Sequence, residues 1–186
     1  MKRLFTVLFA VVAVGLQAAP FISIGDLKLY QAYAPSDSKA QLREYLPLGE
    51  NFEHWNRLAS VRVFKDLKNP KAYLLTAAAG VTKSHPAARY QFLVNDKTKE
   101  LILDFMTFPP DSTKERFAEW NLMRAKVVEG VGLVVYQYAM RVYVIGKETG
   151  PIITAERKKM VGPFQEASFE EESAPHTADP TSAILP

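Results

Sequence analysis

Residues 133–145, LVVYQYAMRVYVI, decide the fold of this 186-residue chain. The stretch is dense in β-branched and aromatic side chains, which fit the pleated and half-buried surface of a strand. It follows a turn, Glu129-Gly130-Val131-Gly132, and residues 121–128 before that turn also suit a strand. We therefore expect the two stretches to form a β-hairpin.

A second interpretation makes part of the same region helical. Ser112-Thr113-Lys114-Glu115 matches a capping box, and Phe117, Trp120 and Met123 follow at helical spacing. These signals predict a helix that runs to Lys126. We favour the hairpin over this helix, because the strand that would pair with residues 121–128 is unambiguous.

Patterns on both sides of this hairpin predict the remaining strands and helices. Further strands are expected at residues 22–33, 58–64, 89–94 and 100–108. One helix is predicted from Asn69-Pro70 to Gly80, and another from Gly150-Pro151 through Val161, where Gly162-Pro163 would end it. The fold class that follows is α+β, an antiparallel sheet of five or six strands with two main helices packed against it.

The two ends of the chain differ from its middle. Residues 1–18 combine Lys2 and Arg3 with an apolar run and small residues before a cleavage site after Ala18, as in a secretory signal peptide. The alternative is an uncleaved anchor, since residues 4–24 carry no charge. Residues 19–164 form the single domain. Residues 165–186 contain five acidic residues and no Lys or Arg, and we expect a disordered tail. The predicted location is periplasmic or secreted.

Several chemistries are excluded or disfavoured by composition. The chain has no cysteine, which excludes disulfides, thiolate metal sites and a Cys nucleophile. Residues 19–164 carry 21 basic and 15 acidic residues, a mild +6, and an exported protein rarely meets nucleic acid, so nucleic acid is not an expected partner. No catalytic or nucleotide-binding motif is present, and the three histidines are isolated in the sequence. We predict no catalytic residue, no metal site and no cofactor.

The strongest candidate site is a set of arginines interleaved with aromatic residues. On one sheet face they would form a cationic, aromatic surface for a carboxylate, a phosphate or a glycan. The alternative is that the aromatic residues are core and the arginines lie on the solvent side. The candidates are Trp55, Arg57, Arg62, Trp120, Arg124, Tyr138 and Arg141.

A resemblance adds to this interpretation. The motifs that carry it are Tyr45-Leu46-Pro47-Leu48-Gly49-Glu50 with Trp55, Glu119-Trp120-Asn121-Leu122-Met123-Arg124, and Tyr136-Gln137-Tyr138-Ala139-Met140-Arg141. They resemble a group of small exported bacterial proteins of unassigned activity over residues 40–145, and the order of elements is similar to that of PsbP-like sandwiches. The resemblance implies a noncatalytic envelope protein and assigns no functional residue.

Three functions are compatible with these patterns. The first is a noncatalytic binding module that meets another envelope protein, as an inhibitor or immunity protein does. The second binds an anionic or glycan ligand of the envelope through the arginine and aromatic residues. The third is an envelope hydrolase that uses Asp104 and Glu53, which would need the two carboxylates about 5 to 9.5 Å apart. After signal cleavage no membrane-spanning segment is expected.

Overall fold

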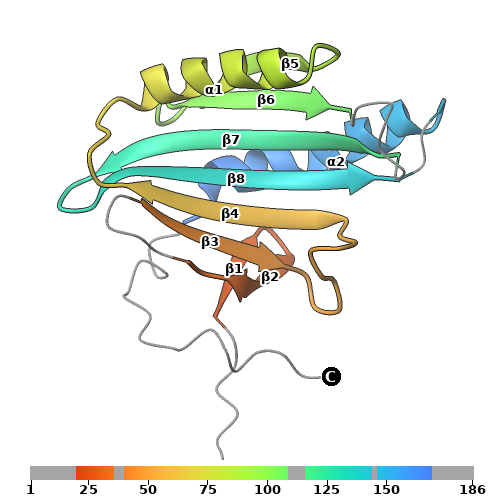
Figure 1. Ribbon diagram of the computed structural model, residues 1–186, viewed down its shortest axis with the longest axis horizontal. Helices are drawn as coiled ribbons and strands as arrows, with labels where there is room; N and C mark the ends of the chain where they lie inside the picture. The colour runs from red at the N-terminus through yellow and green to blue at the C-terminus, as the bar shows by residue number, and fades with distance from the viewer. Residues whose placement is uncertain (1–19, 36–39, 109–115, 144–145, 169–186) are drawn as a thin grey trace, which may run out of the picture.

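The computed structural model describes residues 20–35, 40–108, 116–143 and 146–168. These residues form one eight-stranded antiparallel sheet with two helices (Figure 1). The predicted signal segment 1–18 and residues 169–186 of the predicted tail lie outside the described residues. The strands are β1 (Phe21–Ile24), β2 (Leu27–Tyr33), β3 (Ala40–Leu46), β4 (Arg57–Phe64), β5 (Arg89–Val94), β6 (Leu101–Thr107), β7 (Ala118–Val128) and β8 (Gly132–Val142), and the helices are α1 (Pro70–Ser84) and α2 (Thr149–Glu166).

The sheet consists of two four-stranded meanders joined at a seam. Its order is β1-β2-β3-β4-β8-β7-β6-β5, so β1 to β4 are neighbours in chain order and so are β5 to β8. The seam is the antiparallel pair of β4 and β8, with Arg57 opposite Met140 and Phe64 opposite Leu133. The segment containing α1 carries the chain from β4 at the seam to β5 at the far edge.

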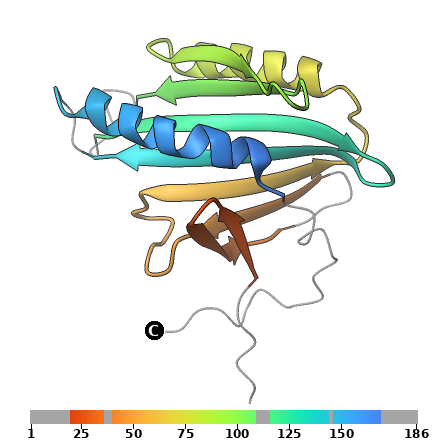
Figure 2. The same cartoon turned by 180° about the vertical axis from the view of Figure 1, so that it is seen from behind.

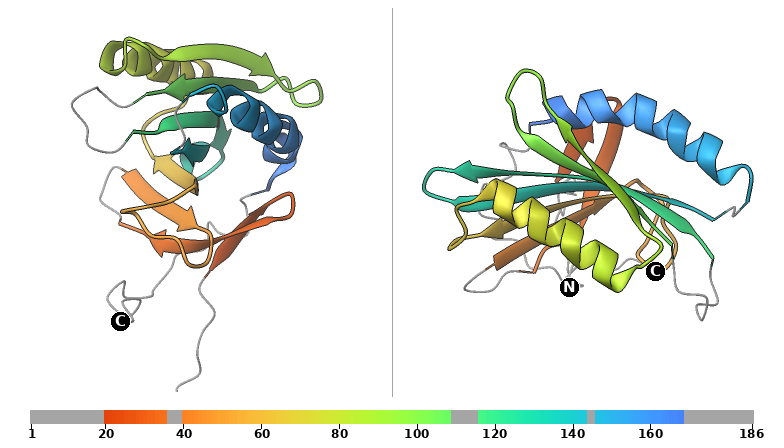
Figure 3. Two further views of the ribbon diagram at one scale, coloured as in Figure 1. Left: turned by 90° about the vertical axis from the view of Figure 1, so that its right-hand side faces the viewer. Right: turned by 90° about the horizontal axis from the view of Figure 1, so that it is seen from above.

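Each face of the sheet has its own core, because side chains alternate along every strand. On the α2 face, Ile153, Met160 and Phe164 of α2 pack against a cluster that includes Trp120 and Tyr138. On the α1 face, Leu74 and Ala78 of α1 pack against Leu103, Met123 and Val135. Figure 3 shows the helices on opposite sides of the twisted sheet, and Figure 2 shows α2 lying along β7 and β8.

Part of the α1 face has no helix over it. Helix α1 lies mainly over β6 and β7, and it also reaches Leu133 and Val135 of β8 and Phe64 of β4. In Figure 1, β8, β4 and β3 therefore lie in front of the viewer, with α2 behind the sheet. We call the α1-face side of these three strands, apart from Arg62, Phe64, Leu133 and Val135, the helix-free surface.

Several local predictions are confirmed. The hairpin interpretation of residues 121–128 is correct, since β7 pairs with β8 over its whole length. The β5–β6 hairpin is present. Helix α1 begins after Asn69, whose side-chain oxygen accepts a hydrogen bond from the N–H of Ala72, with Pro70 in the first turn.

The expected number of strands, five or six, is wrong, because the sheet has eight. Residues 22–33 are two strands, joined by a tight turn in which Gly25 has a φ of 58°, with Ile24 opposite Leu27. Ala40–Leu46, which was not predicted as a strand, is β3, paired with β2 and β4. A two-residue Gly-Asp turn is a hairpin signal. The prediction of one strand over residues 22–33 did not take this turn into account.

The predicted end of the second helix is also wrong. Helix α2 continues through Gly162-Pro163 to Glu166. Phe164 is fully buried in the α2-face core, and Pro163 packs against the turn at Gly25. This packing offsets the cost of a proline inside a helix. Neither α2 nor the other helix of the described chain is long and apolar enough to cross a bilayer.

The start of β8 gives a test of the seam. Gly132 has a φ of 118°, and a Cβ there would lie 2.5 Å from the carbonyl oxygen of Phe64. Gly132→Ala should lower the free energy of unfolding by about 3 kcal/mol, from backbone strain and overpacking together. Gly130→Ala is the matched control: its φ is 74° but the space around it is open, so about 1 kcal/mol is expected. Equal losses in chemical denaturation would contradict the close approach at the seam.

Candidate functional site

The structure divides the seven predicted site residues between the two faces of the sheet. Arg62 and Arg141 lie on the α1 face, and Trp55 packs there on Leu58 and Ala139. The other four belong to the α2 face, beneath or beside α2: Arg57, Trp120, Arg124 and Tyr138. The seven residues therefore do not form one surface.

On the α2 face, a carboxylate of the helix is held between two sheet side chains. Arg57 Nε lies 2.9 Å from Glu156 Oε1, and the Tyr138 hydroxyl donates to the same oxygen at 2.7 Å. Only 9% of the Glu156 side chain is exposed. This triad joins α2 to both strands of the seam.

The triad shifts the acidity of all three groups. Burial acts most strongly on Glu156 and raises its pKa, but the hydrogen bonds from Arg57 and Tyr138 together with nearby positive charge outweigh it, so the pKa is lowered. The hydrogen bond to Glu156 raises the pKa of Arg57. Burial, followed by the bond to Glu156, raises the pKa of Tyr138. The triad is therefore an ion pair with a neutral tyrosine at neutral pH.

Two further polar contacts hold α2 to the sheet. Asp104 accepts hydrogen bonds from Trp120 Nε1 at 2.7 Å, from Gln91 at 2.9 Å and from Arg157 of α2 at 2.6 Å. Arg124 bonds the carbonyl oxygen of Ala167, at the end of α2, and pairs with Glu100 at 3.3 Å. These contacts give Arg57, Trp120, Arg124 and Tyr138 structural roles.

On the α1 face, polar side chains form a row across three strands. Arg62 donates to Gln137 Oε1 at 3.0 Å, and Gln137 donates to Asn121 Oδ1 at 2.7 Å. Asn121 in turn donates to Glu119 at 3.2 Å, and Glu119 pairs with Arg141 at 2.9 Å. The row runs across the α1 face from β4 through β8 to β7.

Arg141 lies between two aromatic rings at the end of this row. Its guanidinium carbon is 4.0 Å from the centre of the Trp55 ring and 4.2 Å from that of Phe117. Tyr143 lies beside Phe117, and the ring of His54 stacks on Tyr143 at 4.1 Å. Cation–π contacts of this kind hold the arginine and the two rings in one place.

The β3–β4 loop that carries Trp55 is fastened by its own hydrogen bonds. Asn51 Oδ1 accepts from the backbone N–H groups of Glu53 and His54. Glu50 accepts from the N–H groups of Asn56 and Arg57. The Tyr143 hydroxyl donates to the carbonyl oxygen of Trp55 at 2.8 Å. The loop is therefore bound both to itself and to the chain just after β8.

Large apolar side chains are exposed around this loop. Leu48 is 75% exposed, Tyr33 49% and Phe52 43%. Tyr33 and Phe52 contact each other edge to face, with ring centres 6.2 Å apart. We call these three residues, together with Arg141 and the rings around it, the aromatic end. Its members are Tyr33, Leu48, Phe52, His54, Trp55, Phe117, Arg141 and Tyr143.

Most residues of the aromatic end were not among the predicted site residues. Only Trp55 and Arg141 were. Leu48 carried a signal, since an apolar residue between Pro47 and Gly49 sits in a turn, where it has little opportunity to be buried. Phe117 and His54 carried none, because each reaches its place through tertiary contacts.

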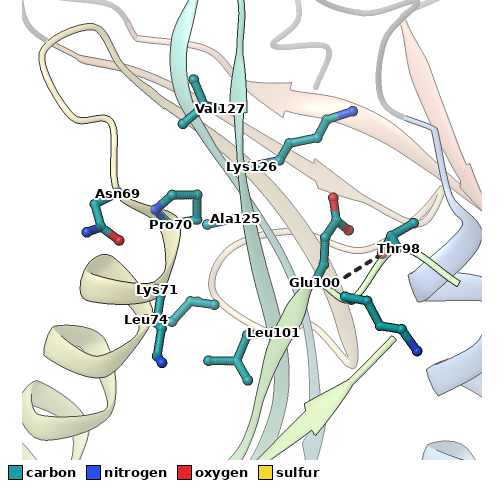
Figure 4. A pocket seen from close by; sticks show the side chains of 11 residues that line it. Asn69, Pro70, Lys71, Leu74, Thr98, Glu100, Leu101, Ala125, Lys126 and Val127 are labelled. Atoms are coloured by element: carbon teal, nitrogen blue, oxygen red, sulfur yellow. Dashed lines mark hydrogen bonds between the residues drawn. The ribbon is translucent and has the colours of Figure 1, made fainter. Parts of the chain in front are cut away.

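A groove of about 480 Å³ lies at the other end of the sheet, between the start of α1 and strands β6 and β7 (Figure 4). Leu74, Leu101 and Ala125 are among its apolar lining residues. Lys71 and Lys126 also line it, but their side chains extend in different directions. The ammonium of Lys126 lies 5.8 Å from the Tyr136 ring centre. The groove does not gather charge at one point.

The fold and these surfaces define a helix–sheet–helix protein with one helix-free surface. The model of one protein family matches residues 21–169, and the chain belongs to that family. The family is uncharacterised and indicates no function. Neither the curated proteins nor the solved structures contain a match to the chain.

The Glu156 triad gives a prediction for stability and its pH dependence. Glu156→Gln should lower the free energy of unfolding at neutral pH by about 2 kcal/mol, less than the usual cost of breaking a fully buried pair because the Arg57 side chain is 34% exposed. Since folding lowers the pKa of Glu156, its stabilisation is complete above the ordinary value of 4.5 and is lost as the pH falls through the folded value. Denaturation at several pH values measures both effects.

A matched control lies on the same helix. Glu166 pairs with Lys97, but both side chains are well exposed, so Glu166→Gln should have no measurable effect on stability. If Glu156→Gln were as stable as the unmodified protein at neutral pH, the triad would not hold α2 in place.

Proposed function

We propose that this chain is a noncatalytic, exported binding module that docks a protein partner of the cell envelope through the aromatic end. The observation that carries this proposal is that Leu48 and Phe52 are exposed on the β3–β4 loop, with Tyr33 against Phe52, and that the same loop carries the Trp55 that packs on Arg141. Contiguous exposed apolar groups on a soluble domain typically mark an interaction site.

The composition of the aromatic end favours a protein as its partner. Aromatic residues and arginine are enriched in the cores of protein interfaces and supply most of their binding energy. The hydrogen-bonded β3–β4 loop holds Leu48 and Phe52 in place before binding. Ordering of this loop would therefore add little to the conformational entropy cost of binding.

An anionic or glycan ligand is less well supported. Arg141 is paired with Glu119, and Arg57 and Arg124 are paired with Glu156 and Glu100. Arg62 donates to Gln137, and its charge acts on Glu44, where it partly offsets the effect of burial. An anion at any of these arginines would compete with an existing protein contact.

A carboxylate-based hydrolase is also disfavoured by geometry. Both oxygens of Asp104 accept hydrogen bonds on the α2 face. Glu53 lies in the exposed loop before β4, and β4 and β6 are separated by β8 and β7. Three strand spacings amount to about 14 Å, beyond the range for glycoside chemistry.

The docking proposal is tested by charged substitutions at exposed positions. The double variant Leu48→Arg, Phe52→Arg should fold normally and should lose a stoichiometric envelope partner that the unmodified protein captures after crosslinking. Leu75→Arg is the matched control, because Leu75 is 48% exposed but lies on α1. Capture that is equal for both variants, or the absence of any stoichiometric partner, would contradict the proposal.

Export has a separate test. The signal pattern in residues 1–18 predicts that the mature protein begins at Ala19 and is periplasmic or secreted. Intact-mass measurement of the protein from the envelope fraction should give that N-terminus. A protein recovered from the membrane with residues 1–18 still attached would favour the uncleaved anchor instead.

A further inference from the structure

Strand β5 is the outermost strand of the second meander, and its outer edge has no partner among the described residues. Natural proteins usually protect such an edge with lysine, proline, a bulge or a covering segment. The β5 sequence, RYQFLV, contains neither lysine nor proline, and its register with β6 is unbroken. Apart from the charged Arg89 at its first position, β5 itself therefore carries none of the usual protections.

The register shows which backbone groups of β5 point outward. Asn95 and Glu100 lie opposite one another where the hairpin closes, and the N–H of Asn95 donates to the carbonyl oxygen of Glu100. Bonded and non-bonded pairs alternate along an antiparallel ladder. Arg89, Gln91 and Leu93 therefore bond β6. The N–H and C=O groups of the intervening residues, Tyr90, Phe92 and Val94, face away from it.

The same three residues present apolar side chains on the α1 face. Tyr90 is 49% exposed and Val94 53%, whereas Phe92 is half-buried. The rings of Tyr90 and Phe92 contact each other with centres 5.9 Å apart. The outer edge thus combines free hydrogen-bonding groups with an apolar strip.

We propose that β5 pairs with β5 of a second copy of this chain, antiparallel and with Phe92 on the two-fold axis. In this register Phe92 faces Phe92 and Tyr90 faces Val94 of the other copy. All of these residues have outward backbone groups, so each pair exchanges both of its hydrogen bonds. Two eight-stranded sheets become one continuous sheet.

Charge and side-chain placement favour this occupant. Arg89 would face Asn95 of the other copy, so no two like charges stand opposite one another. A slip of one residue would set backbone groups that face outward opposite groups that already bond β6. It would also place side chains on the wrong faces of the sheet. The same patch serves both copies, as a two-fold interface requires. The dimer goes beyond the docking proposal: β5 is at one edge of the sheet, so it would leave two aromatic ends free to bind.

Sedimentation equilibrium of protein expressed from the full sequence tests the pairing. We expect a concentration-dependent monomer–dimer equilibrium. Tyr90→Pro removes an outward N–H without touching the β6 ladder, and it should raise the dimer Kd about tenfold or more, since two-fold symmetry removes the bond twice. Tyr90→Ala keeps the N–H and should weaken the dimer less.

Amide hydrogen exchange gives an independent measurement on the unmodified protein. In a monomer the amides of Arg89, Gln91 and Leu93 are protected, while those of Tyr90, Phe92 and Val94 exchange quickly. In the dimer both sets are protected at high concentration, and the second set loses protection on dilution. This readout decides the proposal even if Tyr90→Pro fails to fold.

Three results would overturn the pairing. The first is a monomer at every concentration, with rapid exchange at Tyr90, Phe92 and Val94. The second is a dimer whose Kd is unchanged in a folded Tyr90→Pro variant, which would place the interface elsewhere. The third is protection of the outward amides only in the presence of an envelope peptide, which would make a foreign strand the occupant.

Discussion

The antiparallel pairing of β4 with β8 is the interaction on which the rest of the structure depends. It joins the two meanders into one sheet. Both β4 and β8 contribute one face of side chains to the core beneath α2. The close approach of Gly132 to the end of β4 shows how tightly the seam is built. Because α1 crosses to the far edge from this point, the seam also determines which strands it covers and which remain helix-free.

The α2 helix is attached to the sheet by charge as well as by apolar packing. Glu156, Arg157 and the carbonyl oxygen at Ala167 each bond a sheet side chain. Removing one partner of such a buried set costs far more than removing a surface pair. These contacts use Arg57, Arg124 and Asp104 for structure, whereas the aromatic end and the outward-facing residues of β5, Tyr90, Phe92 and Val94, take no part in them.

The sequence predicted the parts of the fold that depend on local signals. The Asn69-Pro70 helix start, the β5–β6 hairpin and the strand character of residues 121–128 are all present. It failed where a short signal competed with a long pattern, as in the Gly25-Asp26 turn, and where packing overrode a breaker, as at Pro163. The candidate site was predicted only in part. Trp55 and Arg141 were among the candidates, but the Phe117 ring that also contacts Arg141 was not, because a distant part of the chain supplies it.

Sequence alone determined that neighbouring residues of 58–64 point to opposite faces of a strand, but it did not place Arg57 on that strand and it grouped Arg57 with Arg62 in one candidate surface. It also determined the β-rich character of residues 133–145 and the pattern of an export signal. Only the tertiary structure decided that Arg57 meets Glu156 under α2 while Arg62 lies on the α1 face, where it donates to Gln137. The physical reason is that strand periodicity orders faces within one strand, whereas the helix that covers a face is chosen by contacts between residues far apart in the chain.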